Sequence, residues 1–425
     1  METWQDISKK KCSLTSLGQS RVPADNMALL QESIIGRMDL SRQMSEEEVR
    51  ELIDEEISKE GKARHLTLDT KAALRKEIYH TIRELGILQD LIDDPEITEI
   101  MVNGTTPIFV EKEGKISQLS VSFESEEKLN HVIQQIVSRC NRVINEASPI
   151  VDARLKDGSR VSAVLTPIAL NGPILTIRRF PREAITMEQL VSMNSITQEA
   201  AEFLKKMVQA GYNILVSGGT GSGKTTFLNV LSGFIPETER VITIEDSAEL
   251  QLQNLSNLVR LETRNANVDG CREITIRDLI KASLRMRPSR LIVGEVRGKE
   301  AVDMLQSVNV GHYGMTTVHA NSVRDVVSRL ETMVLMGMDL PLNAIRKQIV
   351  SGFDLMIHLG RLRDGSRRVL EIAEPLSVAG EEVQIQTLFR FFETGVDKRG
   401  RVSGELKKMG ELKYEEKLKA AGISI

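Results

Sequence analysis

The ten residues SGGTGSGKTT, 217–226, combine four glycines with a lysine and two threonines. Gly218, Gly223, Lys224 and Thr225 match the phosphate-binding pattern G-x-x-x-x-G-K-[ST], between an expected strand, NILVS, and an expected helix, TTFLNVLSGF. In such a loop, glycines allow consecutive backbone N–H groups to point at an anion, and the helix N-terminus adds the positive end of its dipole. The candidate nucleotide-binding residues are Gly218, Gly219, Thr220, Gly221, Ser222, Gly223, Lys224, Thr225 and Thr226.

Lys224 and Thr225 indicate which ligand this loop would hold. The lysine ammonium at this position can reach the β- and γ-phosphates of a nucleotide, and the threonine hydroxyl can ligate Mg²⁺. We therefore expect ATP and Mg²⁺ as cofactors. The alternative is a glycine-rich loop that binds no ligand.

Three later segments are apolar strands that end in polar residues. RVITIEDSAEL ends at Glu245 and Asp246, SRLIVGEVRG ends at Glu295, and GMTTVHAN ends at His319. In an open parallel sheet, ligands bind at the carboxyl ends of the strands. The sequence therefore predicts that these side chains gather around phosphates held after NILVS, although each strand-end residue taken singly could be a solvated turn residue.

Glu295 and Glu245 are candidates for the chemistry of nucleotide hydrolysis, which needs a metal ion and a positioned water. A Walker B strand normally offers an aspartate, but that position is Gly294 here. Glu295 is therefore expected either to serve the Mg²⁺ shell through water, with Thr225 as the other metal-site residue, or to polarise the attacking water. Glu245 is the second candidate for that water.

His319 lies seven residues after His312 and is expected to sense the γ-phosphate. The alternative is a neutral histidine that ties two loops together. The remaining histidines have no such context and are treated as ordinary: His65, His80, His131 and His358.

Arginines matter because hydrolysis builds negative charge that one lysine does not fully offset. Arg160, in DGSRVSAV, and Arg178 and Arg179, in LTIRRF, lie beside expected turns well before the loop. They are either solvated surface residues or arginine fingers that reach a nucleotide site between domains or subunits. Four more arginines flank the Glu295 strand and could line a subunit interface: Arg285, Arg287, Arg290 and Arg297.

Changes in composition and hydrophobic periodicity divide the chain into five segments. Residues 1–43 are polar and predict a disordered leader, and residues 44–93 predict a helical module. Short β-rich runs between turn residues predict a compact α+β domain over 94–183. Residues 184–194 suggest a linker, and alternating strand and helix patterns over 195–425 predict a mostly parallel sheet covered by helices.

Capping boxes mark where several helices should begin. The pattern occurs at Ser45 with Glu48, at Ser195 with Gln198, at Thr275 with Asp278 and at Ser322 with Asp325. The second of these helices is expected to run to about Gln209, with Gly211 as its stop.

The composition favours a soluble cytoplasmic protein. Of the 425 residues, 41% are hydrophobic and only 4% are aromatic, and the net charge is −4, so direct nucleic-acid binding is not expected. Cys12, Cys140 and Cys271 are not spaced for a zinc knuckle or a redox pair. No apolar stretch approaches the about 18 residues that span a bilayer, and the N-terminus lacks the apolar core of a signal peptide.

Four segments together resemble the ATPases of type II and type IV secretion systems. GGTGSGKTT, TIEDSAEL, SLRMRPSRLIVGEVRG and GHYGMTTVHANS are similar to the Walker A motif, Asp box, atypical Walker B motif and His box of that family. DPEITEIMVNGTTPIFVEKEGKI, DARLKDGSRVSAVLTPIALNGPILTIRRF and NAIRKQIVSGFDLMIHLGRLRDGSRRVLEIAE resemble its CpaF branch, the ATPases of tight-adherence (Flp) pilus assembly. The resemblance covers residues ~70–390. The chain lacks the four-cysteine insert of the zinc-bearing branch and has Arg297-Gly298 where many relatives have Arg-Asp.

The resemblance implies an α/β fold: a RecA-like P-loop ATPase domain preceded by a PAS-like α+β domain and a helical module. It implies a homohexameric ring in which Arg160 and Arg178, by motif position, complete the ATP site. It also implies docking on an inner-membrane platform protein at the cytoplasmic face, where the motor would drive pilin extraction or insertion.

Three alternatives remain open from the sequence. The same ATPase could serve DNA or protein export in a type IV secretion system. It could be a nucleotide-gated scaffold with slow or no hydrolysis, or a P-loop kinase that acts on a small molecule, although the sequence shows no lid segment.

Overall fold

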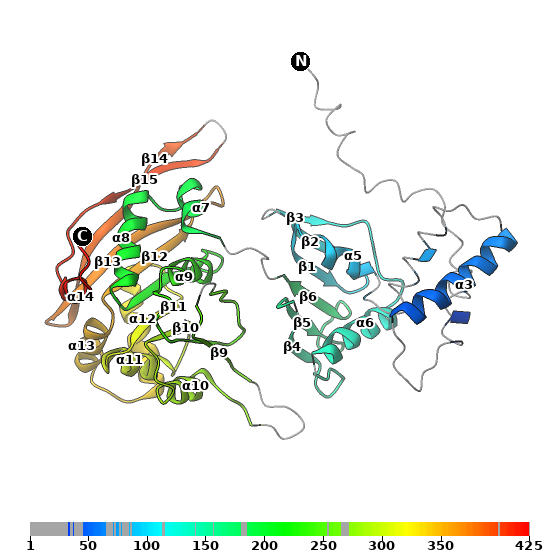
Figure 1. Cartoon of the computed structure of the whole chain (residues 1–425), viewed down its shortest axis with the longest axis horizontal. Helices are drawn as coiled ribbons and strands as arrows, with labels where there is room; N and C mark the ends of the chain where they lie inside the picture. The colour runs from blue at the N-terminus through cyan, green and yellow to red at the C-terminus, as the bar shows by residue number, and fades with distance from the viewer. Residues whose placement is uncertain are drawn as a thin grey trace, which may run out of the picture. The chain divides into compact units, whose positions relative to one another are not determined.

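The computed structural model describes residues 33–34, 37, 46–64, 71, 74–75, 78, 85, 87–112, 115–140, 142–155, 157–179, 185–252, 255–264, 272–397 and 400–424. The chain divides into two compact units, Met1–Phe180 and Pro181–Ile425 (Figure 1). The expected leader, 1–43, lies outside the described residues except at positions 33, 34 and 37, where the backbone is helical and Ile34 is buried. Within the described residues, no helix is long and apolar enough to cross a membrane.

The first unit contains an antiparallel sheet of six strands in the order β3-β2-β1-β6-β5-β4. The helices with described bounds in this unit are α3 (Glu46–Arg64), α5 (Ile87–Asp93) and α6 (Glu126–Arg139). Its strands are β1 (Ile97–Asn103), β2 (Ile108–Lys112), β3 (Lys115–Gln118), β4 (Ile150–Arg154), β5 (Arg160–Val164) and β6 (Ile174–Arg178). Leu88 of α5 packs in the same core as strand residues Ile100 and Ile177, so α5 belongs to the core of this sheet.

The second unit contains a sheet of nine strands in the order β15-β14-β13-β12-β7-β11-β10-β8-β9. The block from β12 to β9 is parallel, whereas β12, β13, β14 and β15 pair antiparallel, so the expected mostly parallel sheet carries an antiparallel extension. The strands are β7 (Ile214–Gly218), β8 (Val241–Glu245), β9 (Leu258–Glu262), β10 (Arg290–Val296), β11 (Tyr313–Val318), β12 (Leu355–Arg361), β13 (Arg367–Ala379), β14 (Glu382–Val396) and β15 (Val402–Lys408).

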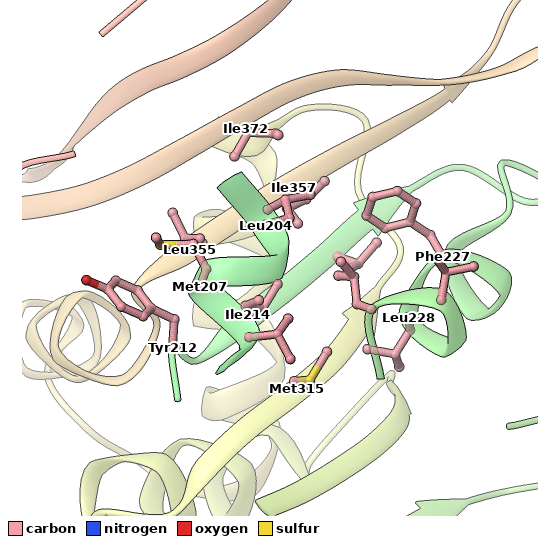
Figure 2. Close-up of a cluster of buried hydrophobic side chains, with 14 of the residues drawn as sticks. Leu204, Met207, Tyr212, Ile214, Phe227, Leu228, Met315, Leu355, Ile357 and Ile372 are labelled. Atoms are coloured by element: carbon pink, nitrogen blue, oxygen red, sulfur yellow. The ribbon is translucent and has the colours of Figure 1, made fainter. Parts of the chain in front are cut away.

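Helices cover both faces of this second sheet (Figure 1). They are α7 (Met187–Ser192), α8 (Gln198–Gln209), α9 (Lys224–Ser232), α10 (Ile276–Ser283), α11 (Ala301–Asn309), α12 (Val323–Gly337), α13 (Leu342–Gly352) and α14 (Glu416–Ala421). Side chains alternate along a strand, so Ile214 and Val216 of β7 pack in one core with α8 and α9, and Leu215 packs in the other with α11, α12 and α13. Figure 2 shows the first core, with Leu204 of α8 near Ile357 of β12.

The segment 184–194 is not an extended linker where the structure describes it. Thr186 and Gln189 form a capping box that starts α7, and Met187 and Leu190 of this helix are buried in the core of the second unit. This helix has only six residues, so its apolar side chains show little periodicity. The sequence therefore did not distinguish it from a connecting segment.

The expected helix starts have different outcomes. The capping box of Thr275 and Asp278 is present at α10, and the Ser322 side chain accepts the Asp325 N–H at α12. Ser195, by contrast, does not cap α8, which begins two residues later than expected after Thr197 and has no side-chain cap hydrogen bond. The box at Ser45 falls on a residue outside the described part of the chain.

Arg290 does not line a surface, contrary to the expectation for the four arginines around β10. Its side chain is fully buried, its Nε lies 2.9 Å from Glu239 Oε2, and its Nη2 donates to the Val208 carbonyl at 2.8 Å. Its guanidinium also lies 5.4 Å from the centre of the Tyr313 ring. Because a buried arginine needs partners for its charge, this residue stabilises the interior of the second unit.

Candidate nucleotide-binding site

The loop 217–226 joins β7 to α9, as the glycine–lysine pattern predicts. Gly221 and Gly223 have φ values of 72° and 92°, a region that favours glycine, and Gly223 is the N-cap of α9. Gly218 is glycine for a second reason, since a Cβ there would lie 2.5 Å from the Leu359 carbonyl oxygen of β12. The turn therefore needs glycine both for its backbone angles and for its close contact with the neighbouring strand.

Lys224 is the buried cation at the start of α9. Only 7% of it is exposed, and its Nζ donates to the carbonyls of Gly218 and Gly219 at 3.1 Å each. Its Nζ also lies 3.2 Å from His319 Nδ1. Burial lowers the pKa of Lys224, with Glu295 acting in the opposite direction, so an anion bound here would favour the charged ammonium.

Glu295 and His319 lie at the ends of β10 and β11, beside Lys224. His319 Nε2 is 2.8 Å from Glu295 Oε1, and Arg297 Nη2 donates to Glu295 Oε2 at 2.7 Å. Burial lowers the pKa of His319, although Glu295 raises it. The ammonium, the imidazole and the carboxylate thus form one contiguous group at the loop.

His312 does not belong to this group. It precedes β11, whereas His319 follows it, so the two histidines lie at opposite ends of one strand. His312 Nδ1 lies 3.2 Å from the Pro288 carbonyl oxygen. The seven-residue spacing therefore reflects the length of β11.

Glu245 ends β8 and is almost completely buried, with 3% exposed. Its Oε1 accepts the N–H groups of Glu249 and Leu250 at 2.9 Å each, and its buried Oε2 has no hydrogen-bond partner among the described residues. Burial raises the pKa of Glu245 to about 7. A Cβ on Gly294 would lie 3.0 Å from Glu245 Cγ, so the glycine in the atypical Walker B strand leaves room for this side chain.

A pocket of about 360 Å³ adjoins the loop on its β11 side. It is lined by Gly219, Thr220, His319, Ala320, Asn321, Asp325 and Arg329. The pocket therefore continues from the Lys224–His319 contact towards the first turns of α12.

The residues present fit a magnesium ion that is shared with a nucleotide. No group of three or more His, Cys, Asp or Glu side chains in the described part of the chain could hold a metal ion alone. Mg²⁺ in nucleotide sites typically takes one or two protein oxygens and completes its shell with phosphate and water. Thr225, at the start of α9, and Glu295 are the residues that could supply those oxygens.

Arg160 and Arg178 lie side by side in the first unit, because β5 and β6 pair with these two residues opposite each other. Both are exposed. Arg179 differs, since its Nη1 donates to the backbone carbonyls of Asp94 and Ile97. Arg179 thus holds the segment between α5 and β1 and is not a free arginine finger.

Two contacts of the loop involve residues to which the sequence assigned no role. Arg367 Nε donates to the Gly221 carbonyl at 2.9 Å, and His358 Nδ1 lies 3.0 Å from the Ser217 hydroxyl. His358, treated as ordinary from its sequence context, is buried beside the loop. The sequence signal for Arg367 is the arginine-rich segment RLRDGSRR. In the sequence analysis this segment indicates only the similarity to the CpaF branch.

The second unit is an α/β fold whose parallel strands carry the loop 217–226 at their carboxyl edge, and its likeness to solved structures identifies it as a RecA-like fold. The solved structure of the pilus retraction motor PilT with bound ADP is similar to this chain, with a TM-score of 0.52 and 21% identity over 69% of this chain and 83% of that one.

The family model for type II/IV secretion system proteins matches residues 81–385, and the chain belongs to this family. A putative conjugal transfer protein of Mycobacterium tuberculosis is 34% identical over 72% of this chain and 88% of its own length. The type IV secretion system protein PtlH of Bordetella pertussis is 31% identical over 68% of this chain and 93% of its own length.

Proposed function

We propose that this protein is an ATPase that hydrolyses ATP to ADP and phosphate and uses the energy to drive a filament or secretion machine. The observation that carries the proposal is the convergence of Lys224, His319 and Glu295, from α9, β11 and β10, on one side of the loop. Family membership supports it, because the matched region spans both units.

In this proposal, the chain's own residues hold and orient the reactants. Lys224 offsets charge on the β- and γ-phosphates, and the neutral form of His319, which burial favours, contacts the terminal phosphate. Glu295, oriented by His319 and Arg297, positions a water in line with the terminal phosphorus, and the bond to the bridging oxygen breaks. Mg²⁺, when bound, supplies further charge neutralisation. Glu245 is the second group that could accept the water's proton.

Steady-state phosphate release tests the proposal. Lys224→Ala should abolish hydrolysis and weaken ATP binding, because it removes the buried cation. Glu295→Gln should lower kcat by at least about 100-fold, the scale of losing one group that acts on the transition state, and leave ATP binding nearly unchanged. A Glu295→Gln protein with full activity would refute the assigned role.

The same assay separates the alternatives. A nucleotide-gated scaffold would bind ATP and form an assembly without releasing phosphate. A small-molecule kinase would release ADP only with an acceptor and would form a phosphorylated product.

The proposed motor is a cytoplasmic homohexamer bound to an inner-membrane platform protein, with Arg160 and Arg178 completing the ATP site. Their exposure and their pairing across β5 and β6 support a joint role, because two exposed guanidiniums side by side suit a polyphosphate. Mass measurement of the protein with a non-hydrolysable ATP analogue tests the hexamer. Arg160→Ala with Arg178→Ala tests the site: kcat should fall while the ring still forms.

The machine that it drives has two candidates. The segments that resemble the CpaF branch favour Flp-type pilus assembly. The relatives named for conjugal transfer and type IV secretion favour export of DNA or protein. Replacing the chromosomal copy by the Lys224→Ala variant distinguishes them: loss of surface filaments supports the first, and loss of DNA transfer or protein secretion with filaments intact supports the second.

A further inference from the structure

The turn between β12 and β13, residues 361–368, lies against the phosphate-binding loop. β12 runs parallel to β7, with Leu359 paired to Gly218, so the end of β12 and the start of the loop are neighbours. The turn has the sequence RLRDGSRR and so contains four arginines.

Arg363 and Arg368 have partners in their own unit. Arg363 Nη1 donates to Glu393 Oε2 at 2.7 Å. Arg368 Nη2 donates to the Val402 carbonyl at 3.0 Å, and its guanidinium lies 5.5 Å from the centre of the Phe391 ring. These two arginines hold the turn to β14 and β15.

Arg361 and Arg367 are placed differently, because they face each other across the antiparallel pair of β12 and β13. Like charges directly opposite each other in a ladder are destabilising. Both side chains are exposed, and among the described residues neither forms an ion pair. Asp364, the acid of the turn, accepts the N–H groups of Ser366 and Val402 at 2.9 and 2.7 Å. The pair thus carries two positive charges that the described residues do not neutralise.

Both arginines lie at the loop. Arg367 Nε donates to the Gly221 carbonyl at 2.9 Å, and Arg367 Cδ would lie 3.4 Å from a Cβ on Gly223. Arg361 Nη1 would lie 4.0 Å from a Cβ on Gly221. The hydrogen bond from Arg367 fixes the orientation of the peptide group between Gly221 and Ser222. Gly221 and Gly223 have positive φ values, and glycine restricts the backbone least of all residues, so this contact limits a conformation that the loop sequence leaves open.

The sheet order decides which end of a nucleotide they would meet. β7 has β11 on one side and β12 on the other. Lys224, His319 and Glu295 gather on the β11 side, where the terminal phosphate belongs in the proposed function. A phosphate chain that begins there and follows the loop reaches the β12 side at its nucleoside end.

We propose that Arg361 binds the α-phosphate, the phosphate next to the ribose, and that Arg367 is a positioning residue that holds the loop at Gly221. This inference rests on the proposed function, because it assumes that a nucleotide occupies the loop. An anion between the two guanidiniums would also relieve their mutual repulsion.

Calorimetric binding of ADP and of a non-hydrolysable ATP analogue to the full-length protein tests the proposal. Arg361→Gln should raise both Kd values by about tenfold, the scale of one charge-assisted hydrogen bond, and leave their ratio unchanged. Arg363→Gln, in the same turn but paired with Glu393, is the matched control and should stay within about twofold of wild type for both ligands. Arg367→Gln should also weaken both, and Arg367→Lys, which keeps a donor for Gly221, should recover most of the loss.

Thermal unfolding without nucleotide separates ligand binding from folding. Arg361→Gln removes one of two opposed charges, so its Tm should equal or exceed that of wild type. A lower Tm, or a Kd for ADP within twofold of wild type, would overturn the proposal. A loss of affinity for the ATP analogue alone would place Arg361 at the terminal phosphate and overturn the assignment to the α-phosphate. Failure of the wild-type protein to bind either ligand would instead refute the proposed function itself.

Discussion

The protonation of the Glu245 carboxyl depends on its buried surroundings. The carboxyl is buried, one oxygen holds the N–H groups of Glu249 and Leu250, and the other oxygen has no partner among the described residues. Burial therefore favours the protonated form, which is why its pKa rises to about 7. Near neutral pH, this group can gain or lose a proton with little free-energy cost, as a proton acceptor requires.

The raised pKa of Glu245 predicts a pH-dependent stability. The folded protein binds the proton more tightly than the unfolded chain, whose carboxyl has the usual value of 4.5. The stabilisation is complete below about pH 4.5 and is lost as the pH rises to about 7. Glu245→Gln cannot ionise, so its free energy of unfolding relative to wild type should grow between pH 5 and pH 8, by up to about 3 kcal/mol.

Urea denaturation at both pH values measures this difference. Glu237→Gln, with an exposed side chain just before β8, is the control and should show no such growth. An offset for Glu245→Gln that stays constant with pH would contradict the assigned burial effect.

Gly294 is the second residue whose role depends on Glu245. An alanine there would bring its Cβ to 3.0 Å from Glu245 Cγ and 3.4 Å from Oε1. We expect Gly294→Ala to lower the free energy of unfolding by about 1–3 kcal/mol, as overpacking in a core does, and to reduce phosphate release. Gly298→Ala is the matched control, because its Cβ would meet only Glu300 Oε2 at 3.5 Å. Equal effects of the two substitutions would refute the proposed contact.

At the scale of elements, α8 and α10 show two ways in which a helix begins. At α10, Thr275 and Asp278 satisfy each other's backbone N–H groups. At α8, Thr197 makes no cap hydrogen bond, and its buried hydroxyl has no partner among the described residues. The start of α8 is set by the apolar face that it buries in the core, with Ala200, Ala201 and Leu204.

The two caps should therefore respond differently to the same substitution. Thr275→Ala should lower the free energy of unfolding by about 1 kcal/mol, because it leaves an N–H of α10 without its partner. Thr197→Ala should cost clearly less, since it removes a hydroxyl that caps nothing. Chemical denaturation of both variants measures the contrast, and a larger loss at Thr197 would contradict the absence of a partner for its hydroxyl.

At the scale of the whole molecule, the two units have separate cores. The core of the first unit is built from residues from Leu85 to Ile177, and both cores of the second unit are built from residues from Met187 onwards. A domain with its own core can fold alone. The loop 217–226, Glu245, Glu295 and His319 all belong to the second unit, so the residues of the proposed nucleotide site around Lys224 share one folding unit.

Residues 185–425 should accordingly fold as an independent fragment. We expect cooperative thermal unfolding by circular dichroism and ATP binding within about tenfold of the full-length protein, because the loop and the residues around Lys224 stay complete. Hydrolysis should be slower if Arg160 and Arg178 act as proposed. A fragment that unfolds without cooperativity would show that the first unit is needed for the fold.

The sequence by itself determined the loop and the strand ends that meet it. Ten adjacent residues encode the positive φ values, the helix start and the position of Lys224, and an apolar strand with a polar end predicts Glu245, Glu295 and His319 at one sheet edge. These features are local, or follow from the parallel arrangement of strands. The helix at 187–192 was less visible, because short elements carry little periodicity. The antiparallel direction of β13, β14 and β15 was not visible either, because the direction of a strand depends on its partner and not on its own pattern.

Only the tertiary structure decided which of the arginines are available and which groups support the loop. Arg290 is buried against Glu239, Arg179 holds the α5–β1 segment, and Arg367 reaches Gly221, which is 146 residues away in the chain. The residue type is the same in all three cases, so the sequence alone does not tell which partner each arginine has. Its partner depends on the order of strands in the sheet, and that order results from the packing of the whole unit, which no local pattern contains.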